Sequence, residues 1–190
     1  MIKIKNVHVC GLRESIRRAK FPMSVDPTSL TDTLTDGIKN LALSKSGEGH
    51  DQWLTGVVVQ FDLTFTIKAW VEAERYHFFD FVSSQSTMHR ITKFDIKSQC
   101  NEYVSPRIIA EVERLVNIYK ENPTPENYLY VLYNVPTGFQ LTAGMTTNYR
   151  QLKTIYKQRK SHRLPEWREF CEWCLTLPMF KEICVDGVED

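Results

Sequence analysis

The sequence predicts a single α+β domain over residues 1–190, built from long antiparallel strands packed with several helices. Residues 57–69 alternate between apolar and mostly polar side chains, the pattern of a long strand with one buried face. Residues 105–123 repeat apolar side chains at helical spacing behind a serine, the pattern of a capped amphipathic helix. A chain of this length, without linker or internal repeat, can bury one real core.

The first half of the chain begins with a strand, because Ile2, Ile4, Val7 and Val9 alternate with mostly polar residues. Four further elements are expected in this half: a short helix that ends near Pro22, a helix over 34–43, the strand over 57–69 and a helix over 71–82. The helix over 71–82 would end in the polar stretch 83–90.

The second half is mostly helical. Ser105 is a plausible N-cap, and Pro106 stands at the first helical position of the helix that follows it. After this helix the pattern predicts four elements: a short helix over 125–136, a strand over 137–146, a helix over 147–163 and a helix over 165–178.

Composition excludes little but gives no support to several classes of partner. The chain is 42% hydrophobic and 25% charged, with a formal net charge of +1, which is ordinary for a globular protein. This balance gives no global argument for nucleic acid, and no apolar run approaches the roughly 20 residues that span a bilayer. The start of the chain reads as a strand and not as a signal peptide, so we expect a cytoplasmic protein.

The cysteines point to structure more than to chemistry. Five cysteines form an odd set without a secretory signal, which favours reduced thiols. Cys171 and Cys174 make a C-x-x-C, but no second pair follows at zinc spacing. We therefore expect these two side chains in the core, and we expect no metal site.

One basic stretch and one histidine could carry chemistry. Six Lys or Arg residues and no acid lie between Thr147 and Pro165. Arg159 shares a helix face with Leu152 and Ile155, and an arginine among apolar residues needs a planar partner such as a carboxylate or a phosphate. An anion site, a solvated basic face and a nucleic-acid surface all remain open for this helix.

His50 lies in a glycine-rich turn next to Asp51. No serine or cysteine motif accompanies the pair, so nucleophilic catalysis gains no support and a structural histidine is the simpler interpretation. The sequence also contains no phosphate-binding glycine loop, no H-E-x-x-H and no EF-hand loop.

The order of these parts resembles the flavin-dependent thymidylate synthases, the ThyX family. In that family a G-H turn leads through a strand to the motif R-H-R-x-x-S-x-N-x-x-S-x-R, and a helix N-x-R-x-L-x-x-F-x-x-x-R follows later. Gly49 and His50 match the turn. Aligning the last arginine of the motif on Arg90 places Ser83 on its first serine and Gln85 on its asparagine.

The later helix and the segment after it also match. Residues Asn148, Arg150, Leu152 and Arg159 have the spacing of the N-x-R-x-L…R helix, and Ser161, His162 and Glu166 approximate the segment that follows. The opening "GLRESIRRAKFPM" is similar to the start of phage-encoded relatives. The resemblance covers about residues 10–175 and implies a ThyX-like fold.

The departures from the family lie at the head of the motif. The R-H-R falls on Phe78, Phe79 and Asp80, so two cations and an imidazole become two rings and a carboxylate. The second serine falls on Met88, and the Glu-His pair expected after the turn falls on Thr55 and Gly56. Each charge-assisted contact that is lost removes about 1.5–3 kcal/mol of favourable binding free energy. A carboxylate at Asp80 would also repel a phosphate.

The resemblance implies an enzyme that methylates dUMP or a related pyrimidine nucleotide with FAD, a methylenetetrahydrofolate one-carbon donor and NADPH as reductant. It also implies a homotetramer with sites between subunits and, if the chain is phage-encoded, a bacterial host cytoplasm. The cofactor-binding candidates are His50, Phe78, Phe79, Asp80, Ser83, Gln85, Asn148, Arg159 and His162. The substrate-binding candidates are Arg75, Met88, His89, Arg90 and Arg150.

Two other functions remain open. The replaced R-H-R favours a nucleotide- or flavin-binding protein on the same fold that lacks methyl transfer. The basic helix, with Tyr149 and Tyr156, would suit a nucleic-acid-binding accessory protein if its cations were exposed on one continuous face. We do not expect nucleic acid or a membrane as the main partner.

Overall fold

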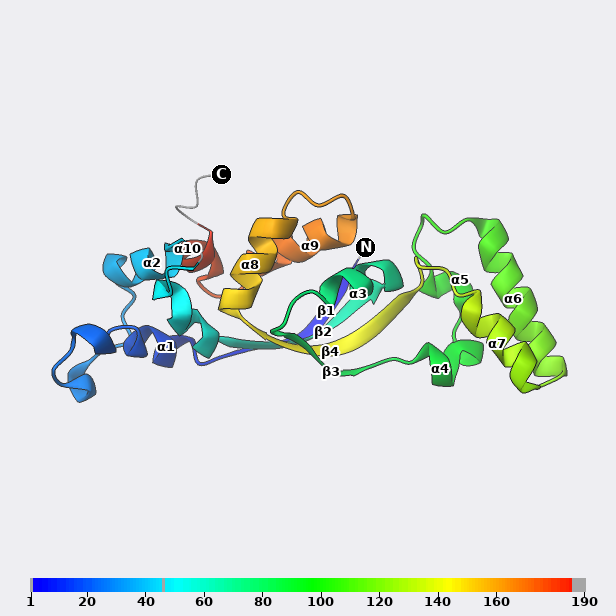
Figure 1. Ribbon diagram of the computed structural model, residues 1–190, viewed down its shortest axis with the longest axis horizontal. Coiled ribbons are helices and arrows are strands. Elements are labelled where there is room, and N and C mark those ends of the chain that lie inside the picture. The colour runs from blue at the N-terminus through cyan, green and yellow to red at the C-terminus, as the bar shows by residue number, and fades with distance from the viewer. Residues whose placement is uncertain (1, 46, 186–190) are drawn as a thin grey trace.

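A central antiparallel sheet carries helices along one side and at both ends, in an elongated body (Figure 1). The computed structural model describes residues 2–45 and 47–185. Its four-stranded sheet has the order β1-β2-β4-β3. The strands are β1 (Lys3–Cys10), β2 (Val58–Thr66), β3 (Phe79–Ser84) and β4 (Gln140–Asn148). The predicted α+β class is confirmed.

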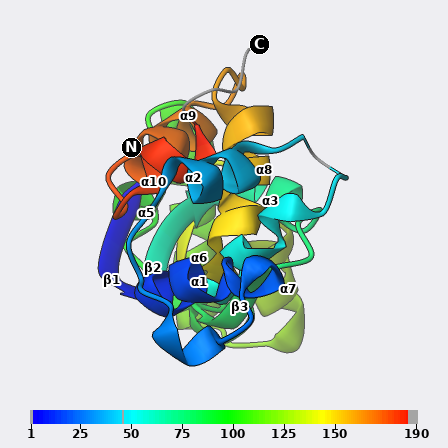
Figure 2. The ribbon, with the colours of Figure 1, turned by 90° about the vertical axis from the view of Figure 1, so that its left-hand side faces the viewer.

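The helices fall into three groups along the long axis (Figure 1). At one end lie α1 (Leu12–Arg18), α2 (Asp36–Leu43), the 3-10 helix η3 (His50–Gly56) and α10 (Phe180–Cys184). Over the middle of the sheet lie α3 (Ile67–Ala73), α8 (Tyr149–Arg159) and α9 (Pro165–Cys174). The view along the long axis shows α8 and α9 together on one side of the strands (Figure 2). At the other end lie α4 (Thr87–Arg90), α5 (Ile96–Gln99), α6 (Pro106–Glu121) and α7 (Pro125–Tyr133).

The main core lies between the sheet and the middle helices. Alternate residues of β2 point into it, and Val59, Phe61, Leu63 and Phe65 are buried as predicted. Phe65 meets Trp167 of α9 with ring centroids 5.0 Å apart. The other face of the sheet is polar, where the hydroxyls of Thr64 and Thr142 lie 2.8 Å apart across β2 and β4. One covered and one solvated face explain the alternation in the sequence.

The first strand forms where predicted, but its pattern is broken. Asn6 adopts a left-handed conformation with φ 52°, and the register against β2 shifts between Lys5 and His8. This bulge lets Ile4 and Val9, which are an odd number of residues apart, both pack on the core. Val7, one of the apolar residues that indicated this strand, is exposed.

The long strand ends earlier than predicted. We expected Ile67 and Ala69 in the strand, but β2 stops at Thr66 and both residues belong to α3. The Thr66 side chain accepts a hydrogen bond from the Ala69 amide at 3.2 Å, which caps the new helix. The cap ends an alternation that apolar periodicity alone would have continued.

The predicted helix over 71–82 is wrong beyond Ala73. Phe79–Ser84 forms the edge strand β3, antiparallel to β4. Phe79 is buried against Phe61 and Phe170, and Phe81 packs on Trp70 with centroids 4.9 Å apart. Pairing with a strand some 60 residues later along the chain overrides the local helical character of this segment.

The helices expected over 34–43, 105–123, 125–136, 147–163 and 165–178 all form, with ends shifted by a few residues, whereas the short helices α4, α5 and α10 were not predicted. The Ser105 side chain accepts from the Arg107 amide at the start of α6, which confirms the predicted cap. A second, smaller core joins α6 and α7 around Val112, Val116 and Val131. Cys171 and Cys174 of α9 are buried in the main core, as predicted, and all five cysteines are free thiols.

Candidate functional site

Two of the segments that could carry chemistry meet at the start of α8. The Arg150 guanidinium donates to the Asp51 carboxylate, with Nε 2.9 Å from Oδ1, and to Gln52 Oε1 at 2.7 Å. Lys153, one turn later, donates to Asp51 Oδ2 at 3.1 Å and to the carbonyl oxygen of Ala42 at 2.6 Å. The Asp51 side chain is only 7% exposed, so one buried carboxylate holds two cations.

Local sequence explains this arrangement. Asn148 ends β4 and caps α8, because its side chain accepts from the Gln151 amide at 2.9 Å. Gly49 adopts φ 80°, a conformation that favours glycine, and turns the chain into η3 just before Asp51. His50 points to solvent at this turn. About a third of the Arg150 side chain, 36%, stays exposed, so its guanidinium can still meet a ligand.

Phe78, Phe79 and Asp80, which replace the R-H-R of the family, lie near the start of α8 on the edge strand of the sheet. Phe79 is opposite Thr147 and Asp80 is opposite Thr146, just before α8 begins. The Thr147 hydroxyl donates to the Phe78 carbonyl oxygen at 2.6 Å. Phe79 is core, whereas the Phe78 ring is 62% exposed and Asp80 is exposed. Only Phe78 and Asp80 therefore offer side chains to a ligand.

The tail of the same motif runs away from Arg150. Ser83 is opposite Gly144, and Gln85 lies beside Thr142. The Gln85 amide donates to the Thr142 carbonyl oxygen at 2.9 Å, and the Thr142 amide donates to Gln85 Oε1 at 2.9 Å. Four residues of strand separate Thr146 from Thr142, a span of about 13 Å. Arg90 lies further along, on α4, where the Tyr128 hydroxyl donates to the carbonyl oxygen of Met88 at 2.8 Å. His89, Arg90 and Arg75 are exposed.

Arg159 lies at the opposite end of α8, about 15 Å from its start, and has an internal partner. Its Nη1 donates to Glu72 Oε2 at 2.8 Å and its Nε donates to the Tyr76 hydroxyl at 2.7 Å. The guanidinium also stacks over the ring of Trp167, 5.1 Å from the centroid. Arg159 is 7% exposed, so the predicted planar partner exists and is a carboxylate of the same chain.

His162 completes this buried cluster. Its Nε2 lies 3.2 Å from Glu72 Oε2, and its Nδ1 accepts from the Leu164 amide at 3.2 Å. Burial lowers the pKa of His162 below 6.5, and the Arg159 charge lowers it further. Burial raises the pKa of Glu72, but the Lys68 hydrogen bond and the nearby charges of His162 and Arg159 outweigh it, so the carboxyl pKa falls.

The lowered pKa of His162 predicts a pH dependence of stability. Between the folded and the unfolded pKa, the unfolded chain binds a proton that the folded chain releases, so the free energy of unfolding falls as pH drops below about 6.5. Urea unfolding at several pH values between 7 and 5 gives the slope of the free energy of unfolding against pH. We expect this slope to be shallower for His162→Gln than for wild type. The exposed His77→Gln is the matched control and should keep the wild-type slope. Equal slopes for the two variants would contradict the assignment.

The structure thus divides the predicted site residues into three places. His50, Phe78, Asp80, Asn148 and Arg150 gather around the start of α8. Ser83, Gln85 and the Met88–Arg90 segment follow the sheet edge toward α7, and Arg159 with His162 lies inside. Sequence reasoning missed Asp51, Glu72 and Tyr76 as the groups that hold the arginines, and it missed Lys153 as the second cation on Asp51. The adjacency of Asp51 to His50 was the one available signal.

Among residues 2–45 and 47–185, no group of three or more His, Cys, Asp or Glu side chains could hold a metal ion. Within the same residues, no helix is long and apolar enough to cross a membrane.

Comparison with known proteins places the fold. No protein-family profile and no curated protein matches the sequence. Among solved structures, the flavin-dependent thymidylate synthase ThyX from Helicobacter pylori, complexed with FAD and dUMP, superposes with a TM-score of 0.75 at 13% identity, over 98% of this chain and 100% of that one. A second structure of the H. pylori enzyme with FAD and dUMP gives 0.73 at 12% identity, over the whole of both chains.

A third similar structure is the UMP/dUMP methylase PolB from Streptomyces cacaoi, bound with 5-Br dUMP. It superposes with a TM-score of 0.64 at 15% identity, over 96% of this chain and 91% of that one. The chain therefore has the fold of the flavin-dependent thymidylate synthases, as its motif order predicted. At this low identity the likeness shows the fold and leaves activity to be argued from the residues.

Proposed function

We propose that this protein is a divergent ThyX-like nucleotide-binding protein that methylates dUMP or a related pyrimidine nucleotide. One observation carries the proposal. The G-H turn and the N-x-R-x-L helix, two motif segments about 100 residues apart, are joined by the bond between Asp51 and Arg150. The pair holds a part-exposed guanidinium at the surface, and guanidinium is the side-chain group best suited to a phosphate or a carbonyl edge.

The substrate would be bound by cations from two places. Arg150 supplies one, and Arg90 supplies the other, with Arg75, Met88 and His89 beside it. The Arg90 segment is separated from the start of α8 by more than the strand span of about 13 Å between Thr146 and Thr142. Arg90 and Arg150 of one chain therefore cannot both contact one mononucleotide. A neighbouring chain would supply the second group, which fits a homotetramer with sites between subunits.

The cofactor would be FAD, with methylenetetrahydrofolate and NADPH as co-substrates. The exposed Phe78 ring can stack on a flavin or a base. His50 and Asn148 would offer polar contacts at the same end of the sheet, and Ser83 and Gln85 would meet a part of the cofactor further along its edge. Bound FAD would supply hydride chemistry. Arg159 and His162 would support α8 from inside, since their polar atoms already bond within the chain. A flavin phosphate meets no cation at residues 78–80.

A specific observation favours a second candidate, a nucleotide- or flavin-binding protein that has lost methyl transfer. Asp80 is exposed in place of a cation, and a carboxylate there raises the free energy of any phosphate bound beside it. The two candidates differ in catalysis and share binding. Growth of a thymidine-requiring bacterial strain that expresses the protein would establish catalysis, and failure to grow would leave the binding protein.

The nucleic-acid alternative loses its main feature. It needs the cations of α8 on one continuous exposed face, but Arg150, Lys153 and Arg159 each pair with a carboxylate. Binding to oligonucleotides that weakens steeply with salt, together with no response to FAD or dUMP, would revive it. The proposed enzyme would work in the cytoplasm, that of a bacterial host if the chain is phage-encoded.

The binding proposal predicts a thermal shift. A ligand present at 100 times its dissociation constant should stabilise the native state by about 2.7 kcal/mol. We expect dUMP and FAD each to raise the unfolding temperature, and Arg150→Ala and Arg90→Ala each to remove the dUMP shift. Arg18→Ala, an exposed arginine on α1, is the matched control and should keep it. A colourless protein without any shift from FAD would end the flavin proposal.

A further inference from the structure

The edge strand β3 carries a carboxylate that has no task within the described chain. Asp80 is exposed, and its side chain has neither a hydrogen-bond partner nor an ion-pair partner among residues 2–45 and 47–185. Asp51 differs in this respect, because it is buried and holds two cations. A carboxylate without a partner, next to the start of α8, can accept hydrogen bonds from a ligand.

Strand pairing fixes the face of the sheet on which this carboxylate lies. Successive side chains of a strand point to opposite faces, and Phe79 points into the core. Asp80 therefore lies on the solvated face, together with Thr146, its opposite residue on β4. Directly opposed residues of neighbouring antiparallel strands have Cβ atoms about 5 Å apart. A carboxylate and a hydroxyl thus lie side by side, and both can reach one ligand.

An exposed aromatic ring adjoins this pair. Phe78 comes two residues before Asp80, and its ring is 62% exposed. Its carbonyl oxygen accepts from the Thr147 hydroxyl at 2.6 Å, which fixes the backbone where β3 begins. Two residues of extended chain span about 7 Å. The ring can therefore stack on the face of a nucleobase while the carboxylate meets a polar edge of the same base.

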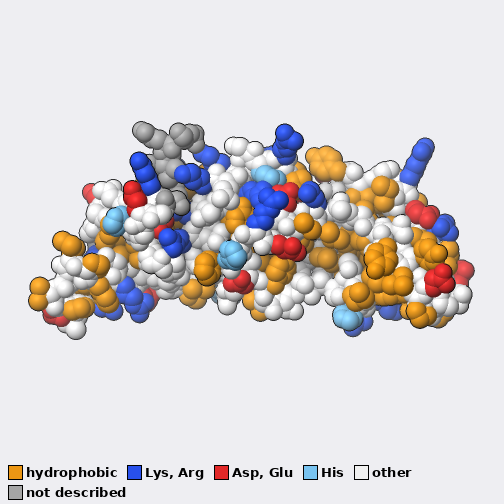
Figure 3. Space-filling model, in the orientation of Figure 1, with side chains coloured by type: hydrophobic (Ala, Val, Ile, Leu, Met, Phe, Trp, Pro, Cys, Tyr) orange, Lys and Arg blue, Asp and Glu red, His pale blue; other side chains and the backbone are white. Residues whose placement is uncertain are grey.

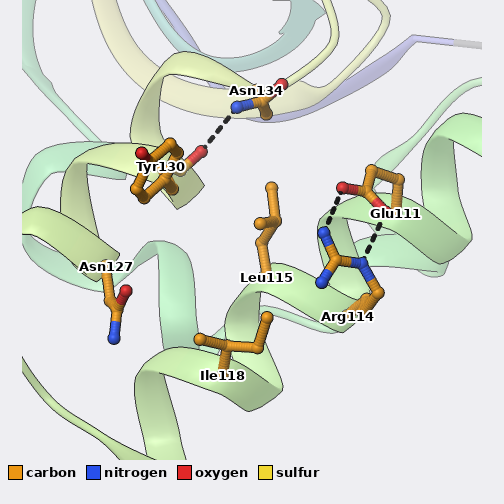
Figure 4. Close-up of a pocket in the computed structure, with 7 residues that line it drawn as sticks. All are labelled: Glu111, Arg114, Leu115, Ile118, Asn127, Tyr130 and Asn134. Carbon is orange, nitrogen blue, oxygen red and sulfur yellow. Dashed lines mark hydrogen bonds and ion pairs between the residues drawn. The ribbon is translucent and has the colours of Figure 1, made fainter.

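The groove between α6 and α7 does not offer this combination. Hydrophobic side chains gather over that end of the molecule (Figure 3), and the groove has a volume of about 340 Å³ (Figure 4). Its two charged groups pair with each other, because the Arg114 guanidinium donates to both Glu111 carboxylate oxygens, at 2.7 and 2.6 Å. The groove also lies at the other end of the body from the start of α8 (Figure 1).

We propose that Asp80 makes this protein prefer a cytosine nucleotide, such as dCMP, to a uracil nucleotide. Cytosine carries an amino group at C4, and acidic side chains accept from this group when they read a base edge. Uracil carries a carbonyl oxygen at the same position, and a carboxylate repels that oxygen. The Thr146 hydroxyl does not discriminate, because it can donate to cytosine N3 or accept from the N3–H of uracil.

Charge then separates the two ends of the nucleotide. The phosphate needs cations, which the proposed site has in Arg150 and Arg90, and the amino group of the base needs an acceptor, which it has in Asp80. The inference therefore rests on the proposed binding of a pyrimidine nucleotide and adds the identity of the base. The change from R-H-R to Phe-Phe-Asp replaces contacts suited to an anion by a stacking ring and a hydrogen-bond acceptor.

Calorimetric titration with dCMP and with dUMP, in the presence of FAD, measures this preference. Wild-type protein should bind dCMP about ten-fold more tightly than dUMP, a ratio that one well-placed polar contact to a base edge gives. Asp80→Asn should bring the two dissociation constants together, because an amide both donates and accepts and therefore suits either base. Circular dichroism confirms that the variant is folded.

Asp62→Asn is the matched control. Asp62 is opposite Gly144, two residues from Thr146 on β4, so it lies on the same solvated face as Asp80. Its carboxylate already accepts from the Asn6 side chain at 2.6 Å. The variant removes one negative charge from the same face and should keep the ten-fold preference for dCMP.

The possible results separate this inference from the proposed function. A protein that binds neither nucleotide overturns both. Equal affinities in wild type, a preference that survives Asp80→Asn, or a preference that Asp62→Asn also removes would overturn the inference alone, because a pyrimidine nucleotide would still bind. Asp80 would then serve only to keep the edge strand from pairing with another chain, a role that charges on edge strands often have.

Discussion

Asp51→Ala should lower the free energy of unfolding by about 3 kcal/mol. The side chain is 7% exposed and bonds to both Arg150 and Lys153, so its removal leaves two cations without their carboxylate. Most of the lost stability comes from Lys153, because its side chain is 13% exposed and its charge would stay buried without a carboxylate. The Arg150 side chain is 36% exposed and can be solvated in part. The loss would also loosen η3 from α8 and α2, because Lys153 ties Asp51 to the carbonyl oxygens of Ala42 and Ser44.

Urea unfolding at neutral pH measures this effect. Asp36→Ala removes an exposed carboxylate from the first turn of α2 and is the matched control, with an expected loss within about 1 kcal/mol. Asp51→Asn should fall between the two, because the amide oxygen still accepts a hydrogen bond but carries no charge. If Asp51→Ala and Asp36→Ala lose the same stability, the carboxylate does not hold the turn.

Arg159→Ala should be at least as damaging, with an expected loss of about 3–5 kcal/mol. The substitution strips Glu72 of its closest cation and the Tyr76 hydroxyl of its donor. It also removes the cation stacked on Trp167, a contact worth about 0.5–2 kcal/mol. Arg159→Lys should recover little, because a single ammonium cannot reach the carboxylate and the phenol with the same planar geometry.

A double substitution separates charge from packing in this cluster. Glu72→Leu with Arg159→Met replaces the buried pair by apolar side chains and should be more stable than either single variant. Lys157→Ala on the same helix is the exposed control, with an expected change within about 0.5 kcal/mol. If Arg159→Ala behaves like Lys157→Ala, the internal cluster is not stabilising, and Arg159 returns as a candidate for direct ligand contact.

Local patterns predicted most elements and failed at particular places. The alternation of Val59, Phe61, Leu63 and Phe65 identified the buried face of β2, since one sheet face is covered and the other solvated. The same reasoning missed the bulge at Asn6, because a single left-handed residue leaves no mark in a pattern of apolar residues. It assigned residues 74–82 to a helix, since their strand character depends on β4 as a partner.

The candidate site divides in the same way. The arginine spacing of α8, the cap at Asn148 and the need of Arg159 for a planar partner are all local and were read from the sequence. The partner itself came from α3, 87 residues earlier, and the carboxylate that holds Arg150 came from a turn 99 residues earlier. Motif spacing cannot reveal such contacts, because spacing along a helix says which residues share a face and not what lies opposite.

The sequence by itself determined the α+β class, the capped helices, the main buried strand and the order of motifs that the ThyX fold bears out. Only the tertiary structure decided that Phe79 is core, that Phe78 and Asp80 face solvent, and that Arg159 is closed inside while Arg150 stays part-exposed. The physical reason is that helix and strand periodicities act within a few residues, whereas exposure and charge pairing depend on chain segments that folding brings together from far apart.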